Sequence, residues 1–412
     1  MMNFFKKNIQ GIACFLFFSL LLSIKSGYSF AALLSLFSSL LFIKNISWKI
    51  LNSKEIFFIT SLVIFSILWG LSFEDDVGLR KINDAFWEYL LAIVVFVAAI
   101  SIKVRRNFYI YGLVTGCILA ATIAVNQYQT IGRAAGFTNA IRFGNLALWM
   151  ACACLIFLFF VKFNNKQKVL IFLGALLGIV ASALSLSRGG WIFVLVLPFL
   201  FLIFMESTER KIKLLFAAFL SSLVLGLVAT NIPFVQTRIH SAKNEVSAYF
   251  GESPGAAVTS VGARLEQWRL AWKMGMEKPW WGWGEEGYLA GREMYAAKGL
   301  ADKTVVDFGH AHNDFLNIFA KKGALGVFGL MLVYLAPLII FWPQKKYFSL
   351  LSQEAAADYK AVCLIGVSIP VAYFIFGLTE YFFYLNIGHV FYLFSIIYTY
   401  SLLKSVQGEM ND

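Results

Sequence analysis

The stretch Trp191-Ile-Phe-Val-Leu-Val-Leu-Pro-Phe-Leu-Phe-Leu-Ile-Phe-Met205 decides the fold class, because it contains no charged residue and no Ser, Thr, Asn or Gln. Runs of this kind recur along the whole 412-residue chain, which is 59% hydrophobic and only 14% charged. Soluble domains are usually about 45–50% apolar and about 25% charged. The composition therefore excludes a soluble enzyme, a disordered protein and a fibre, and it predicts an all-α, polytopic membrane protein.

Twelve apolar runs can be drawn, and we predict about 12 transmembrane helices, although several runs are shorter than the roughly 20 residues that cross a bilayer. Residues 1–232 hold nine spans, residues 233–314 form one long loop, and residues 315–412 hold three spans and the C-terminus. The runs are Ile9–Ile24, Tyr28–Ile43, Ile56–Leu71, Phe86–Ile102, Phe108–Val125, Phe143–Val161, Val169–Leu186, Trp191–Met205, Ile212–Ile232, Phe315–Trp342, Ala361–Leu378 and Tyr381–Leu403.

The net charge of +12 comes from Lys and Arg that concentrate in alternate connections between these runs, for example at residues 103–106 and 162–168. Cytoplasmic loops of membrane proteins are enriched in Lys and Arg, so the pattern places both termini in the cytoplasm. The long segment from Pro233 to Asp314 then lies on the outer side.

Short helices are expected within this long outer loop. Val261–Met276 has the spacing of an amphipathic helix, with Leu265, Trp268, Ala271 and Trp272 on one face. Pro279 ends the pattern, and the following Trp-rich turn is typical of a segment that lies at the membrane surface.

Two arginines on the outer side are candidates for binding an anion. Arg188 lies in Ser185-Leu-Ser-Arg-Gly-Gly-Trp191, on the side where basic residues are scarce, and Arg264 lies near the start of the predicted outer helix. A guanidinium fork and a helix N-terminus both suit phosphate oxygens. The plainer interpretations are a membrane-surface anchor for Arg188 and a solvated helix face for Arg264.

Two of the four histidines, His310 and His312, lie in Gly309-His-Ala-His-Asn-Asp-Phe-Leu316, where the long loop returns to the membrane. A metal site needs three or four ligands, and no third one is visible in the sequence, so no metal ion is expected. A general base for a hydroxyl is the better functional interpretation, since histidine titrates near neutral pH. The alternative is a histidine that caps a helix or lies at the interface.

Together these residues resemble one family. Leu-Ser-Arg-Gly-Gly at 186–190, Val-Thr-Ser-Val-Gly-Ala-Arg-Leu at 258–265, and His-Ala-His-Asn-Asp at 310–314 ahead of Lys-Lys-Gly-Ala-Leu-Gly at 321–326 follow each other as in the O-antigen ligase/polymerase superfamily of bacterial inner membranes. The resemblance is closest to the O-antigen ligases of lipopolysaccharide biosynthesis. It covers the architecture of the whole chain and is specific in these three stretches.

The resemblance implies a GT-C-like membrane glycosyltransferase without metal or other cofactor. Its donor would be an O-antigen linked to undecaprenyl pyrophosphate, its acceptor the lipid A-core oligosaccharide, and its long loop periplasmic. Arg188 and Arg264 match the phosphate-binding arginines of the family, and His312 matches its essential histidine. Supporting roles fall to His310, Asn313 and the outward-facing Arg142. Membrane lipids are the other expected partner, and no nucleic acid is expected.

Other functions stay open at this point. An O-antigen polymerase would use the same chemistry with a different acceptor. A protein O-oligosaccharyltransferase is usually longer than this chain. A transporter of lipid-linked sugars would need polar residues inside the spans, which are almost free of charge.

Overall fold

The computed structural model describes residues 2–41, 51–74, 78–82, 84–212, 233–251, 255–307 and 309–408. Its elements in chain order are α1 (Met2–Leu20), α2 (Gly27–Leu41), α3 (Ser53–Gly70), β1 (Leu71–Glu74), β2 (Gly78–Ile82), α4 (Asp84–Ser101), α5 (Arg106–Ile131), α6 (Ala140–Phe160), α7 (Asn165–Leu184), α8 (Trp191–Phe204), α10 (Pro233–Phe250), η2 (Ala256–Val258), α11 (Ser260–Glu277), α12 (Glu285–Ala297), η3 (Lys303–Val305), α13 (Asp314–Phe341), α14 (Lys346–Leu350), α15 (Gln353–Gly377), η4 (Phe382–Tyr384) and α16 (Asn386–Gly408).

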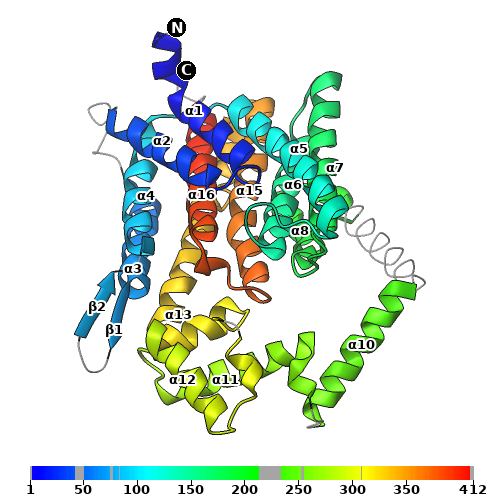
Figure 1. Cartoon of the computed structure of the whole chain (residues 1–412). Helices are drawn as coiled ribbons and strands as arrows, with labels where there is room; N and C mark the ends of the chain where they lie inside the picture. Colours follow the sequence, from blue (N-terminus) through cyan, green and yellow to red (C-terminus); the bar gives the residue numbers. More distant parts are fainter. Residues whose placement is uncertain are drawn as a thin grey trace.

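The apolar helices form a bundle, and α10, α11 and α12 lie together at the end opposite the two chain termini (Figure 1). Helices α5, α6 and α7 pack on one another, α1 packs on α5, and α15 and α16 form the centre. An aromatic cluster fills the middle of the bundle, where Phe18 lies against Tyr109 and Trp149 with ring centroids 5.0 and 6.4 Å apart. Exposed apolar side chains on α7 and α8, such as Phe172 and Phe199, give the bundle a surface that suits lipid.

Six helices of the described residues are long and apolar enough to cross a membrane. They are Ser53–Gly70, Arg106–Ile131, Ala140–Phe160, Asn165–Leu184, Asp314–Leu350 and Gln353–Gly377. Four further apolar helices are shorter, at Asn8–Leu20, Gly27–Leu41, Phe86–Ser101 and Trp191–Phe204. The predicted span Ile212–Ile232 lies, from residue 213 onward, outside the described residues. The multi-helix membrane fold is thus found, whereas the number of twelve spans remains a prediction.

The predicted all-α fold class is found, with one short hairpin between α3 and α4. Strands β1 and β2 form an antiparallel hairpin there, with Leu71 opposite Ile82. The alternation of apolar and polar residues in Leu71-Ser-Phe-Glu74 is typical of a strand, although the loop is short and acidic.

Within the predicted outer loop, α11 extends from Ser260 to Glu277, close to the predicted Val261–Met276. Of the predicted face, Ala271 is buried and Leu265 and Trp268 are half-buried, but Trp272 is exposed. Glu266, outside the predicted face, is buried. Glu266 accepts hydrogen bonds from Arg269 of the same helix and from the Tyr249 hydroxyl of α10 at 2.6 Å each. Burial opposes the charge, but these bonds outweigh it and lower the pKa of Glu266 to about 2. A charged residue with three hydrogen-bonding partners is therefore part of the buried face of α11.

A close crossing fixes the outer helices to the bundle. Gly323 lies at a break inside α13 with φ of 64° and ψ of −162°, a conformation open only to glycine. An added Cβ atom would lie 2.3 Å from the carbonyl carbon of Trp280. The Trp-rich turn docks onto this break through hydrogen bonds from Trp283 N to the Ala320 oxygen and from Ala324 N to the Pro279 oxygen, at 2.9 and 2.7 Å. The crossing thereby links the turn after α11 to the start of α13.

We expect Gly323→Ala to destabilise the protein by about 3 kcal/mol, from backbone strain and from the collision with Trp280. Gly299→Ala is the matched control, since Gly299 also has a positive φ of 68° but would place its Cβ atom in open space. That variant should lose only about 1 kcal/mol. Unfolding of the purified variants in detergent measures both changes, and equal losses would contradict the close crossing.

Candidate active site

Arg188 lies in the tight turn between α7 and α8, and the glycines beside it explain how the turn fits. Leu186 has a left-handed backbone with φ of 56°. A Cβ atom on Gly189 would lie 2.3 Å from the Thr379 hydroxyl, and one on Gly190 would lie 2.2 Å from the Asn145 side-chain oxygen. Only glycine lets the turn press against the ends of α15 and α6 in this way. The turn holds the Arg188 backbone at the end of the bundle where α11 lies.

Arg264 lies one turn into α11, where the local sequence sets the start of the helix. The Thr259 side chain caps the helix by accepting a hydrogen bond from Gly262 N at 3.0 Å. Gly262 itself packs against Ala256, because an added Cβ atom would lie 1.9 Å from that residue's carbonyl oxygen. The stretch from Val258 to Leu265 thus encodes a compact helix start that presents Arg264 to the bundle.

The structure brings the two arginines together. Arg188 and Arg264 line one cavity of about 440 Å³, although they come from segments 76 residues apart in the sequence. A third arginine, Arg133 in the connection between α5 and α6, lines the same cavity and donates a hydrogen bond from Nε to the Ser185 carbonyl oxygen at 2.9 Å. Arg133 was not among the predicted site residues, and its signal in the sequence is its place on the side poor in basic residues. Three guanidinium groups make the cavity suited to a polyanion.

His310 and His312 lie in the short loop before α13, which is held on several sides. Asn313 caps α13 by accepting from Leu316 N at 3.1 Å, and its amide donates to the Leu378 carbonyl oxygen at 3.1 Å. Ala311 N donates to the Asn317 side chain at 3.0 Å. The predicted supporting residue Asn313 therefore positions this loop against the end of α15.

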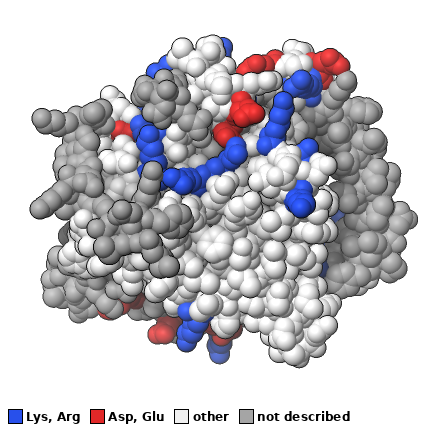
Figure 2. Space-filling view, turned by 90° about the horizontal axis from the view of Figure 1, so that it is seen from above, with Lys and Arg blue, Asp and Glu red and all other residues white. Residues whose placement is uncertain are grey.

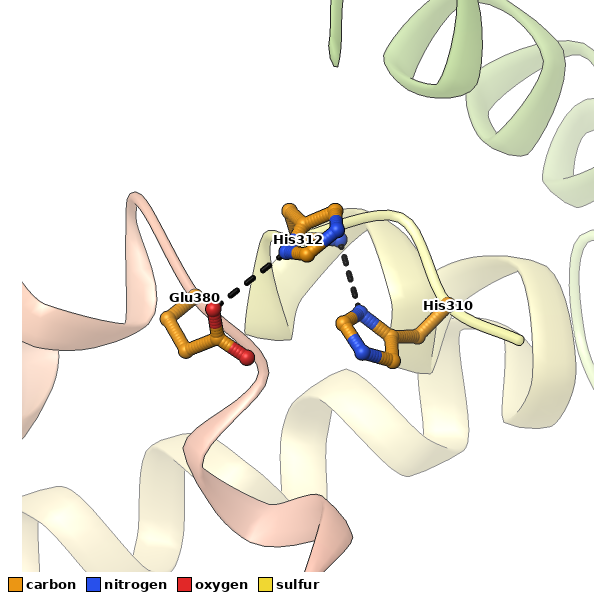
Figure 3. A group of neighbouring side chains, drawn as sticks. All are labelled: His310, His312 and Glu380. Carbon is orange, nitrogen blue, oxygen red and sulfur yellow. Dashed lines mark hydrogen bonds and ion pairs between the residues drawn. The ribbon is translucent and has the colours of Figure 1, made fainter. Parts of the chain in front are cut away.

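His312 has a left-handed backbone with φ of 50°, which is a strained conformation that proteins keep mainly at functional sites. Its backbone N–H donates to His310 Nδ1 at 3.2 Å, and its own Nδ1 lies 3.3 Å from Glu380 Oε2 (Figure 3). A carboxylate can only accept, so Nδ1 of His312 carries the proton in this pair. The other ring nitrogen, Nε2, is then the basic one in the neutral ring.

Glu380 connects His312 to Arg142. Its side chain is 1% exposed, and its Oε1 accepts a hydrogen bond from Arg142 Nη2 at 3.2 Å. The same nitrogen donates to the Tyr381 carbonyl oxygen at 2.7 Å. Glu380 was not among the predicted site residues; it lies in the two-residue connection between the predicted spans Ala361–Leu378 and Tyr381–Leu403. An isolated carboxylate in so short an outer connection was the available signal.

The surroundings of His310 and Glu380 determine whether each side chain is charged. Burial, followed by the neighbouring His312, lowers the pKa of His310 to about 3, so His310 stays neutral at physiological pH. Burial alone would raise the pKa of Glu380, but the hydrogen bond from His312 and the charge of Arg142 outweigh it and hold the pKa below its ordinary value. Glu380 is therefore a permanent anion next to His312.

The ligand atoms of His310, His312 and Glu380 lie within 4.8 Å of one another, so these three residues could also hold a metal ion. Glu380 supplies the third ligand that the sequence did not show. Two features oppose a cation here: the Arg142 guanidinium already neutralises the carboxylate, and His310 Nδ1 already accepts a backbone hydrogen bond. The arrangement favours a hydrogen-bonded histidine–carboxylate pair.

The arginine-lined cavity lies next to the loop that carries His310 and His312. Two chain segments contribute consecutive residues, one to the cavity and the next to the contacts around Glu380. Ile141 lines the cavity while the adjacent Arg142 holds Glu380, and Thr379 lines the cavity while the adjacent Glu380 contacts His312. Guanidinium groups and a histidine–carboxylate pair thus meet at one end of a membrane bundle. This combination is suited to an anionic ligand.

Residues 173–334 match the family model described as O-Antigen ligase, so this part of the chain is similar to O-antigen ligases. The match includes Arg188, Arg264 and His312, whereas Arg142 and Glu380 lie outside it. Members of this family are membrane glycosyltransferase-like enzymes that act on lipid-linked glycans. The chain is also similar to an uncharacterized protein of Haemophilus influenzae (strain Rd), with 25% identity over 390 residues that cover 93% of this chain and 95% of that protein.

The buried pair of Arg142 and Glu380 makes a stability prediction. Glu380→Leu should destabilise the protein by about 3–5 kcal/mol, because it leaves the Arg142 charge buried without its partner. Arg142→Met combined with Glu380→Leu should cost less than Glu380→Leu alone, since no uncompensated charge remains. Unfolding measurements on Glu380→Leu, on Arg142→Met and on the double variant give the coupling energy between the two side chains. Additive losses of stability would show that the side chains do not interact.

Proposed function

We propose that this protein is an O-antigen ligase that transfers O-polysaccharide from undecaprenyl pyrophosphate to the lipid A-core oligosaccharide. The observation that carries the proposal is the meeting of Arg188 and Arg264 at one cavity beside the His312–Glu380 pair. The family match supports the class of substrate, a lipid-linked glycan. The finer assignment to ligase rests on the sequence resemblance.

The arginines fit the charge that develops during transfer. The donor carries the anomeric carbon of its glycan on a pyrophosphate oxygen. When this C–O bond breaks, its electron pair moves onto the pyrophosphate, and the growing negative charge needs fixed positive groups nearby. Arg188 and Arg264 supply these groups from two sides of the cavity, and Arg133 supplies a third. Two or three guanidinium forks can do this without a divalent cation.

His312 and Glu380 fit the other half of the reaction. The acceptor hydroxyl attacks the anomeric carbon, its oxygen forms the new glycosidic bond, and its proton moves to His312 Nε2. Glu380 orients the ring through Nδ1 and stabilises the imidazolium that results. A single displacement of this kind inverts the anomeric centre. Arg142 acts indirectly, because its hydrogen bond holds Glu380 in place.

The proposed location is the bacterial inner membrane, with the site on the periplasmic side. Both chain termini lie at the end of the bundle opposite α11 and α12 (Figure 1), which supports this orientation because the distribution of Lys and Arg predicts cytoplasmic termini. Lipid-linked donor would reach the cavity from the membrane, and the lipid A core would approach from the periplasm.

His312→Ala should lower the transfer rate by about 10²–10⁴-fold, the usual contribution of a general base. His310→Ala removes the acceptor of the His312 backbone hydrogen bond and a ring contact with His312, and should lower the rate less. Transfer by purified protein from a lipid-linked donor measures both, with donor binding as the control for folding. A larger loss in His310→Ala than in His312→Ala would reverse the two assignments.

Loss of the protein from its own cell should distinguish ligase from polymerase. Without a ligase, polymer still forms on the lipid carrier, so lipopolysaccharide should be bare core while carrier-linked polymer accumulates. Without a polymerase, a separate ligase would attach a single unit, which gives core plus one repeat. We expect bare core on a gel of extracted lipopolysaccharide. Core capped with one repeat would identify a polymerase with the same site residues.

A further inference from the structure

A second cavity lies at the other end of the bundle, far along the helices from the active site. It has a volume of about 710 Å³ and opens where α6 and α8 end and α15 begins. Helix α6 begins beside the active site at Ala140, so its last turn is at the opposite membrane face. The lining includes Phe159, Phe160, Phe204, Arg210, Leu351 and Lys360. The proposed transfer reaction assigns no role to this cavity.

One wall of this second cavity is apolar, and contacts between aromatic rings hold its side chains in place. Phe160 stacks on Phe201 of α8 with ring centroids 5.6 Å apart and an angle of 8°, and Phe159 contacts the same ring edge-on at 4.8 Å. Phe204 is 1% exposed, whereas Phe159 is 51% exposed. The wall therefore offers an accessible hydrocarbon surface at the depth where the helices enter the membrane.

The rim of the cavity is basic. Arg210 and Lys360 lie on it together with one carboxylate, Glu206, which pairs with Lys360 at 2.7 Å. The Lys360 ammonium also lies 4.7 Å from the centre of the Phe348 ring, which holds it at the apolar wall. Figure 2 looks onto this face of the molecule and shows Lys and Arg side chains in a curved band. The charge distribution predicts that this face lies in the cytoplasm.

We propose that this cavity binds an anionic glycerophospholipid of the inner leaflet. Its phosphate would lie between Arg210 and Lys360, and the first part of an acyl chain would lie against Phe159 and Phe160. Basic pockets between transmembrane helices on the cytoplasmic side suit such headgroups. The volume falls within the roughly 300–1,000 Å³ of typical ligand sites, enough for a headgroup with the start of its chains. The lipid would hold α6, α8 and α15 together at the end away from the active site.

The test is native mass spectrometry of the whole protein, incubated with equal amounts of phosphatidylglycerol and phosphatidylcholine of the same chain length. We expect preferential retention of phosphatidylglycerol. Arg210→Gln combined with Lys360→Gln should lower its retention roughly 30-fold, since each basic residue contributes about fivefold in affinity for an anionic lipid. Glu206→Gln, which frees Lys360 from its ion pair, should raise retention.

Lys166→Gln combined with Lys168→Gln is the matched control. It removes the same charge from the same face, at exposed positions at the start of α7 outside the cavity, and should leave retention unchanged. Equal losses in the two double variants would overturn the site and leave only a general attraction to the basic face. Displacement of the lipid by soluble glycerol phosphate alone would overturn the lipid assignment in favour of a phosphate site. The opposite effect of Glu206→Gln cannot arise from misfolding, so it separates binding from stability.

Discussion

The buried contact between Arg142 and Glu380 is the interaction on which the site depends. It ties the first turn of α6 to the connection between α15 and α16, and through Glu380 it reaches His312 in the loop before α13. Three segments that are far apart in the sequence therefore meet at one carboxylate. Ion pairs in such surroundings contribute little net stability, because desolvation offsets their attraction. Their retention at this place is better explained by the fixed geometry that they impose on the histidine.

The same constraint joins the two halves of the proposed chemistry. The residues next to Arg142 and Glu380, Ile141 and Thr379, line the cavity that Arg188 and Arg264 share. Any movement of the Arg142–Glu380 pair would shift the base and the walls of the anion cavity together. The tight fit of Gly189 against Thr379, the residue before Glu380, limits that movement. A preorganised site of this kind stabilises developing charge without rearrangement during the reaction.

The parts of the site that the sequence predicted are those that lie in short local motifs. Arg188, Arg264 and His312 each belong to a stretch whose glycines or caps could be interpreted from neighbouring residues. Glu380 and Arg133 could not be found in this way, because their roles come from contacts with residues 68 and 52 positions away. The membrane fold followed from composition, and the alternation at residues 71–74 was the available signal for the hairpin. The predicted helix after Val261 was found, but the burial of Glu266 depends on its contact with Tyr249 of α10, which the apolar pattern of the helix does not contain.

The central claim is that guanidinium groups, and not a metal ion, neutralise the leaving pyrophosphate. Its most direct test is transfer of glycan by purified protein from a polyprenyl-pyrophosphate donor in excess chelator, compared with added magnesium or manganese. The account predicts the same rate in both conditions, together with a large loss of rate in Arg188→Gln. Loss of transfer in chelator that a divalent cation restores would contradict it, and would turn attention to His310, His312 and Glu380 as metal ligands.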